Sequence, residues 1–134
     1  MITSTKVKVT TTGSAGSATG SAESAPFAGK ILAVILVPDS ALPSTTDTTV
    51  FVTKDGDKDV NLETIATFTN SGDTEGVIKR YPIVEADDGA GTSVADTDKT
   101  NVFVPYVTVT GVHIEVAQAD ALTDAVEIEI IYDA

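Results

Sequence analysis

The sequence contains a single histidine, His113, and no cysteine, so few side chains are suited to proton transfer or nucleophilic attack near neutral pH. A Ser-His-Asp triad needs a histidine to take the proton from the serine. His113 lies in the alternating stretch 112–116, whose apolar residues form an inward row, so we expect it to face solvent beside Glu115. The glycines of residues 13–20 do not form a Gly-X-Ser-X-Gly motif. We therefore predict a protein that is not an enzyme.

Two groups of aspartates raise the question of calcium, because alternate carboxylates can converge their oxygens on a hard cation. An EF-hand loop that began at Asp55 would need glycine and glutamate where the chain has Val60 and Ala66. The second group lies in a long loop and follows no motif. We predict no resident cofactor or metal, although a looser calcium-binding loop stays open at either group. The groups are Asp55, Asp57 and Asp59, and Asp87, Asp88, Asp96 and Asp98.

Paired carboxylates also occur at Glu127 and Glu129, on one face of one predicted strand. Strand rise places alternate residues about 7 Å apart, which falls within the separation of glycosidase carboxylate pairs. The chain has no tryptophan and only seven other aromatic residues with which to hold a sugar. We therefore interpret the pair as part of an acidic, solvent-exposed face.

Basic residues are scarce, since the formal net charge is −12. Residues 81–134 hold eleven acidic side chains against one lysine. Such a surface repels nucleic acid and anionic membranes, so we predict neither as a partner. The one basic and aromatic cluster is Lys79-Arg80-Tyr81-Pro82. It is either an ordinary surface cluster or a spot that docks an acidic partner.

The elements that position these residues are predicted to be strands. Valine, isoleucine and threonine are abundant, and turn-forming residues recur every 10–15 residues, which is typical of a sandwich or barrel. We predict an all-β fold, an antiparallel sandwich of about eight strands without helices, with a helical turn at 60–67 as the local alternative. Strand character occurs at residues 6–10, 21–24, 30–37, 46–53, 62–69, 76–84, 102–109, 112–116 and 126–132.

One of these strands, residues 30–37, is apolar on both faces. Antiparallel strands usually expose one face to water, so this strand needs a cover on each side. One cover is the sandwich core. For the other we predict a second subunit or the N-terminal arm. Strict alternation separates the row Ile31, Ala33, Ile35 and Val37 from the row Leu32, Val34 and Leu36.

The length of 134 residues indicates one domain, residues 1–134, in which residues 1–20 are a candidate for an extended N-terminal arm. No signal peptide is visible, and the longest apolar run, 31–37, is too short to span a bilayer. Residues 85–100 form the longest stretch without periodicity. Loops of that length are usually functional or disordered, so this loop and the arm are our candidate contact segments.

Read in order, several pieces of the chain resemble a family of small tailed-bacteriophage virion proteins, the β-sandwich decoration or head-associated proteins, which are often jelly rolls. The resemblance lies in their arrangement from about residue 6 to 132. The pieces are SAPFAGKILAV (24–34), PSTTDTTV (43–50), NSGDTEG (70–76), RYP (80–82), VTGVHIEVA (109–117) and VEIEIIY (126–132).

This resemblance implies a jelly-roll-like fold and a structural role without catalytic residues. The expected function is that of a capsid decoration or cement protein on the outer surface of the virion head. Its partners would be the major capsid protein and further copies of itself, with a trimer favoured. The alternative is an extracellular adhesion or carbohydrate-binding module with an immunoglobulin-like sandwich.

Overall fold

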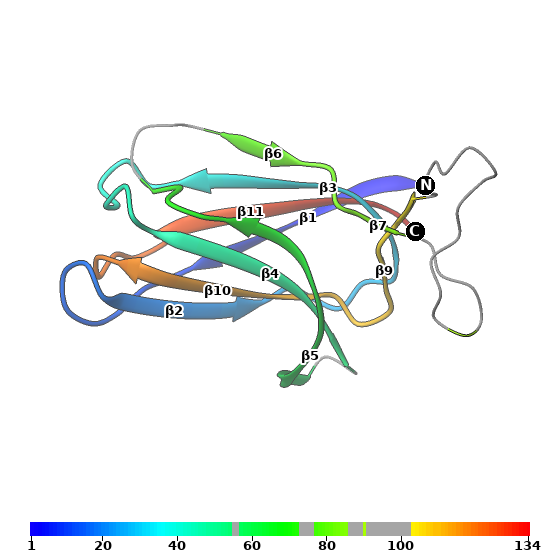
Figure 1. Ribbon diagram of the computed structural model, residues 1–134, viewed down its shortest axis with the longest axis horizontal. Helices are drawn as coiled ribbons and strands as arrows, with labels where there is room; N and C mark the ends of the chain where they lie inside the picture. Colours follow the sequence, from blue (N-terminus) through cyan, green and yellow to red (C-terminus); the bar gives the residue numbers. More distant parts are fainter. Residues whose placement is uncertain (55–56, 73–76, 86–89, 91–102) are drawn as a thin grey trace.

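The computed structural model describes residues 1–54, 57–72, 77–85, 90 and 103–134 (Figure 1). Within these residues the chain forms eleven strands and no helix. This part of the chain therefore contains no helix that could cross a membrane. The strands are β1 (Ile2–Val9), β2 (Ala18–Glu23), β3 (Gly29–Pro38), β4 (Asp47–Lys54), β5 (Asp57–Phe68), β6 (Ile78–Arg80), β7 (Ile83–Glu85), β8 (Phe103–Pro105), β9 (Val107–Thr108), β10 (Val112–Ala119) and β11 (Val126–Asp133).

Eight strands make a sandwich of two antiparallel sheets. One sheet has the order β1-β11-β3-β6, with β9 added beside β3, and the other has the order β2-β10-β4-β5. The eight strands are β1 to β6, β10 and β11. In chain order the first pairs with the last (β1 with β11), the second with the seventh (β2 with β10), the third with the sixth (β3 with β6) and the fourth with the fifth (β4 with β5). This is the strand order of a jelly roll, which confirms the predicted fold class. An immunoglobulin-like sandwich has a different order, so that alternative is wrong.

The core lies between the two sheets and is built from the alternating rows of the strands. The predicted inward rows of β10 and β11 are confirmed, because Val112, Ile114 and Val116 are buried in β10, and Val126, Ile128 and Ile130 are buried in β11. Tyr132 is half-buried and packs on Phe27, with 4.2 Å between the ring centroids. The largest fully buried side chains include Phe68, Ile31, Leu36, Ile114, Ile128 and Ile130.

A β-bulge in β3 changes which residues of the apolar strand share a face. Ile31 pairs with Tyr132 and Ala33 pairs with Ile131, so Leu32 is the extra residue. Because a bulge shifts the alternation by one residue, Ile31 joins Val34 and Leu36 in the core. The predicted row that grouped Ile31 with Ala33 is therefore wrong.

The outer row of β3 is only partly covered within one chain. Exposure rises along it, from Ala33 at 2% through the intermediate Ile35 to Val37 at 37%. Ile35 lies between Glu129 on β11 and Lys79 on β6. One row of β3 therefore enters the core, and the other lies on the outer face between charged neighbours.

Residues 1–20 do not form an extended arm. β1 pairs along its whole length with β11, from Ile2 opposite Asp133 to Val9 opposite Val126. A turn then leads into β2, and the bridge between Thr12 and Thr19 closes it. The N-terminal segment is therefore an edge strand of the sandwich, and it does not cover β3.

Other predicted strands exist with altered limits. β5 spans the segment for which a helical turn was the alternative, so that alternative is wrong. The predicted strand 76–84 is divided into β6 and β7 by Tyr81 and Pro82. The predicted strand 102–109 is divided into β8 and β9 after Pro105. Proline lacks the N–H that a ladder requires, which explains both interruptions. The predicted loop 85–100 lies almost wholly outside the described residues.

Candidate functional site

Three short strands are added to the jelly roll between β6 and β10. β7 and β8 pair only with each other, and β9 pairs with Gly29 and Lys30 at the start of β3. They lie at the end of the sandwich where both chain termini are found (Figure 1). A cross-strand row joins β9 to the chain ends. In this row Val107 is opposite Lys30, Lys30 is opposite Asp133, and Asp133 is opposite Ile2.

This addition and the residues that flank it carry most of the large apolar side chains that the described residues expose. In β7 and β8, Val84 is opposite Val104 and Ile83 is opposite Pro105, so apolar side chains point to both sides of the two-stranded sheet. We call the exposed set the apolar ribbon. It comprises Tyr81 (68% exposed), Ile83 (55%), Phe103 (53%), Val104 (40%), Val107 (54%) and Val109 (73%).

Such a surface is suited to burial against another molecule. An isolated two-stranded sheet is marginally stable in water and gains stability when its faces are packed. Large apolar side chains that gather exposed at one end of a protein are typical of an interaction site. The sandwich, by contrast, hides its large apolar side chains between its sheets.

A turn fixed by hydrogen bonds presents one end of the apolar ribbon. The buried Thr108 hydroxyl donates to the Gly111 carbonyl oxygen at 2.7 Å and accepts from the Gly111 N–H at 3.0 Å. The Thr110 hydroxyl donates to the Thr53 carbonyl oxygen at 3.2 Å, which ties the turn to β4. Gly111 has φ +99°, a conformation that other residues rarely adopt. Val109 at the tip therefore projects from a rigid support.

Cationic side chains border the apolar ribbon. The Lys79 ammonium lies 5.0 Å from the centre of the Tyr81 ring, and Lys30 is the cross-strand neighbour of Val107. The Arg80 guanidinium lies 5.4 Å from the centre of the Phe68 ring, at the flank of the core. Within the described residues, none of these three cations forms an ion pair within 4 Å. The apolar ribbon is thus a positively bordered surface in an acidic protein.

Lys30 also adds to the field around a carboxylate of the same end. The amino group of Met1 lies 2.8 Å from the Asp133 carboxylate. The hydrogen bond and charge of this amino group hold the pKa of Asp133 below its usual value, and Lys30 lowers it further. Because Asp133 is exposed, the contact joins the two chain ends but contributes little to stability.

His113 is buried, with 3% of its surface exposed, so the prediction that it faces solvent is wrong. It does lie on the outer face of its sheet, but β10 is an interior strand between β2 and β4. The ring stacks on Phe51, with 6.2 Å between the centroids, and its Nε2 lies 3.2 Å from a Glu115 carboxylate oxygen. Nδ1 lies 3.9 Å from Glu23 and has no hydrogen-bond partner within the described residues.

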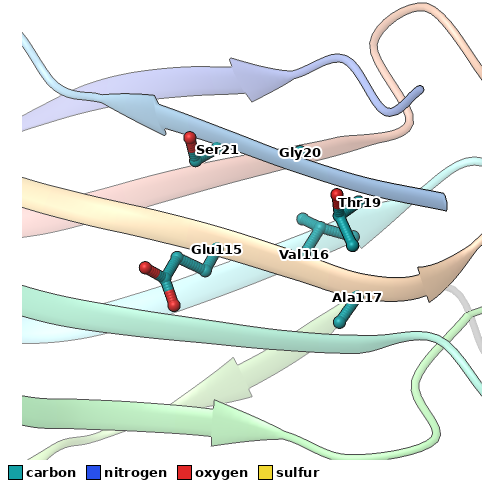
Figure 2. A pocket seen from close by; sticks show the side chains of 6 residues that line it. All are labelled: Thr19, Gly20, Ser21, Glu115, Val116 and Ala117. Atoms are coloured by element: carbon teal, nitrogen blue, oxygen red, sulfur yellow. The ribbon is translucent and has the colours of Figure 1, made fainter. Parts of the chain in front are cut away.

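A shallow groove of about 330 Å³ lies beside Glu115, on β2 and β10 (Figure 2). It occurs where the pairing of these strands shifts by one residue, between Val116 and Ala119. Gln118, in the shifted segment, has φ +54°, and its amide donates to the Asp47 carboxylate at 2.6 Å. The groove is lined by Thr19, Gly20, Ser21, Glu115, Val116 and Ala117. Glu115 is the only charged residue in this lining.

The other predicted acidic residues do not form a site in the described part of the chain. Glu127 lies 3.6 Å from the Lys6 ammonium, and Glu129 lies opposite Lys6 in the ladder, so basic residues border this face. No group of three or more His, Asp or Glu side chains in the described residues is arranged to hold a metal ion. Of the two aspartate groups, Asp55 and the second group, Asp87 to Asp98, lie outside these residues.

Comparisons with known proteins give no relative of this chain. No protein-family model matches it, and no match was found to a curated protein or to a solved structure.

The basic and aromatic cluster is the one predicted feature that the structure places at the apolar ribbon. The sequence predicts that Phe103, Val104 and Val107 lie in a strand, but it does not predict that their side chains are exposed. Pro82 and Pro105 gave a partial signal, since prolines mark strand edges. No pattern in the sequence predicts the groove at Glu115, because its two walls, residues 19–21 and 115–117, are more than ninety residues apart in the chain.

Proposed function

We propose that this protein is a capsid decoration or cement protein of a tailed bacteriophage. It is a structural protein without enzymatic activity that binds the major capsid protein on the outer surface of the virion head and acts as a homo-oligomer. The resemblance of the ordered sequence pieces suggests this role. The jelly roll is compatible with it, because this fold occurs in viral capsid proteins, although it also occurs in lectins and cupins.

The observation that carries the proposal is the apolar ribbon. Six large apolar side chains, each at least 40% exposed, lie on the strands that are additional to the eight-stranded sandwich or directly beside them. Burying them against a capsid surface would remove them from water, and this burial stabilises a complex by about 25 cal/mol for each Å² of apolar area. It would also pack the two-stranded sheet of β7 and β8, which has few other contacts in the described chain.

The charged border supports a capsid surface that is apolar at its centre and acidic at its rim. Lys30 would face the acidic rim, where charges fix orientation and accelerate association more than they add affinity. The acidic remainder of the decoration protein disfavours binding to nucleic acid released from damaged particles.

The test is retention of the protein by phage heads. The heads should come from the phage that encodes the chain, assembled without this protein, and should be sedimented with purified protein. Phe103→Ser and Ile83→Ser should each weaken binding at least about tenfold, the effect of losing about 1.4 kcal/mol of interaction. Val37→Ser is the matched control, because Val37 is an exposed apolar residue on the outer face of β3; this variant should bind normally.

Failure of the unmodified protein to sediment with heads would contradict the proposal. Binding to an immobilised glycan, lost on Tyr81→Ala or Phe103→Ala, would favour the carbohydrate-binding alternative, since aromatic rings hold sugars. The position of the gene beside genes for a major capsid protein and a portal would support the proposed role independently.

A further inference from the structure

The two flanks of the sandwich carry opposite charges that are not neutralised within the described chain. β6 is the outer strand of one sheet, and β2 is the outer strand of the other. β1 lies beside β2, whereas β6 is at the far edge of its own sheet from β1, so β6 and β2 occupy opposite flanks (Figure 1). Contacts between these flanks must therefore join different molecules.

On the side of β2, the outer face of its sheet carries two carboxylates that have no lysine or arginine partner in the described chain: Glu23 on β2 and Glu115 on the neighbouring strand β10. Glu115 and Glu23 lie within 4 Å of the two ring nitrogens of His113 and of no other basic group in the described chain. The hydrogen bond to His113 holds the Glu115 carboxylate in position at the wall of the groove (Figure 2). An oriented carboxylate beside a hollow is suited to receive an ammonium group.

The β6 flank carries the matching cation. The Lys79 side chain is exposed and lies on the outer face opposite Ile35. Within the described residues its ammonium forms no ion pair and lies over the Tyr81 ring. The contrast with Lys6 and Lys8 is informative, because these two lie within 4 Å of Glu127 and Asp124. Lys79 and the adjacent exposed Tyr81 therefore form a projecting charged and aromatic tip.

We propose that the Lys79-Tyr81 tip of one copy docks in the Glu115 groove of the next copy. The two surfaces differ and lie on opposite flanks, so the contact is heterologous and closes into a ring when the rotation between copies permits. The Lys79 ammonium pairs with the Glu115 carboxylate, with Glu23 close to it, and the Tyr81 ring packs on the small residues of β2. This inference rests on the homo-oligomeric part of the proposed function. It places one member of the apolar ribbon, Tyr81, in the contact between copies and leaves the other five exposed for the capsid.

The test is self-association of the purified full-length chain, measured by analytical ultracentrifugation across a concentration series. Lys79→Glu and Glu115→Lys should each raise the dissociation constant at least about tenfold, because each places like charges together. The double variant should return the constant to within about threefold of the original, since the pair is restored with its charges exchanged. Lys8→Glu, a charge reversal on β1, is the matched control and should leave it unchanged.

Glu115→Gln provides a milder variant that keeps an oxygen for His113, and circular dichroism melting checks that every variant is folded. A wild-type chain that stays monomeric at about 100 μM would overturn the inference. So would folded single variants that associate normally, or a folded double variant that does not recover. Retention by phage heads is measured separately. A chain that stays monomeric but binds heads would refute the ring and leave the proposed binding to the capsid standing. A chain that forms the ring but does not bind heads would support the ring and contradict the proposed binding to the capsid.

Discussion

The sandwich and the apolar ribbon use the same kinds of side chain to opposite effect. In the sandwich, Phe68 and Ile114 are fully buried between two sheets whose strands pair along most of their lengths. In the apolar ribbon, Phe103 and Ile83 are more than half exposed, on strands of three residues that pair only with each other. The difference arises from strand length and layering, since a short two-stranded sheet has no second layer to cover it.

This comparison indicates which apolar residues stabilise the fold and which are available to a partner. A side chain that is buried in the folded monomer contributes to the free energy of unfolding. A side chain that stays exposed contributes little to that free energy but can contribute to binding. The following predictions test this division, beginning with the largest expected effect.

The core half of the comparison is tested by Phe68→Ala. Phe68 has no exposed surface, so its truncation should lower the free energy of unfolding by about 3–5 kcal/mol, through lost burial and the cavity that remains. Phe103→Ala in the apolar ribbon should change it by no more than about 0.5 kcal/mol. Guanidinium unfolding followed by circular dichroism measures both. Equal losses would mean that the apolar ribbon belongs to the core and would break the comparison.

Close packing should extend to the edge strand β2, which Gly20→Ala tests. A Cβ at this position would collide with the backbone carbonyl oxygen of Thr10. Because backbone cannot move aside cheaply, we expect a loss of about 1–3 kcal/mol of stability. Ser21→Ala, an exposed neighbour in β2, should be nearly neutral in the same denaturant titration. A neutral Gly20→Ala would show that this edge is loosely held.

The lysines of β1 and β6, the two outer strands of one sheet, should differ in how salt changes their contribution to stability. Lys6→Ala removes a surface ion pair with Glu127 and should cost about 0.2–1 kcal/mol at low ionic strength. The loss should disappear in about 1 M NaCl, where the screening length is about 3 Å. Lys79→Ala should leave monomer stability unchanged at either salt concentration. Thermal melting at both salt concentrations measures these effects, with the protein dilute enough to be monomeric. A salt-dependent loss of stability in Lys79→Ala would contradict the comparison.

The smallest effect concerns the end of the molecule where β1 and β11 meet. The pKa of Asp133 is lowered in the folded chain, so the ionised carboxylate favours folding. This stabilisation is present above the unfolded pKa, near 3.8, and is lost as the pH falls through the lower, folded value. NMR titration of the Asp133 carboxyl should show the lowered pKa. Acetylation of the Met1 amine should return it toward 3.8, and a titration unchanged by acetylation would contradict the proposed cause.

Most of the fold was predictable from local patterns. The alternation of Val126, Ile128 and Ile130 placed them in the core, and Pro82 and Pro105 marked the ends of strands. The bulge at Leu32 was not predictable. The sequence there is uniformly apolar, so no polar residue indicates which side chains face the core and which face outward. The burial of His113 was not predictable for a related reason. Phe51 and two glutamates cover its ring, and the alternation of residues within one strand does not show which residues of other strands lie beside it.

The sequence by itself determined the all-β class, the core rows of the last two strands, and an acidic surface that contains one basic and aromatic cluster. These properties depend on side-chain chemistry and on a period of two residues, which are both local. Only the tertiary structure decided that β6 and β2 lie on opposite flanks, that Glu23 and Glu115 flank a buried His113, and that β7 and β8 expose their apolar residues. Those properties depend on strand order and on which layer covers which face, and both arise from contacts between residues far apart in the chain.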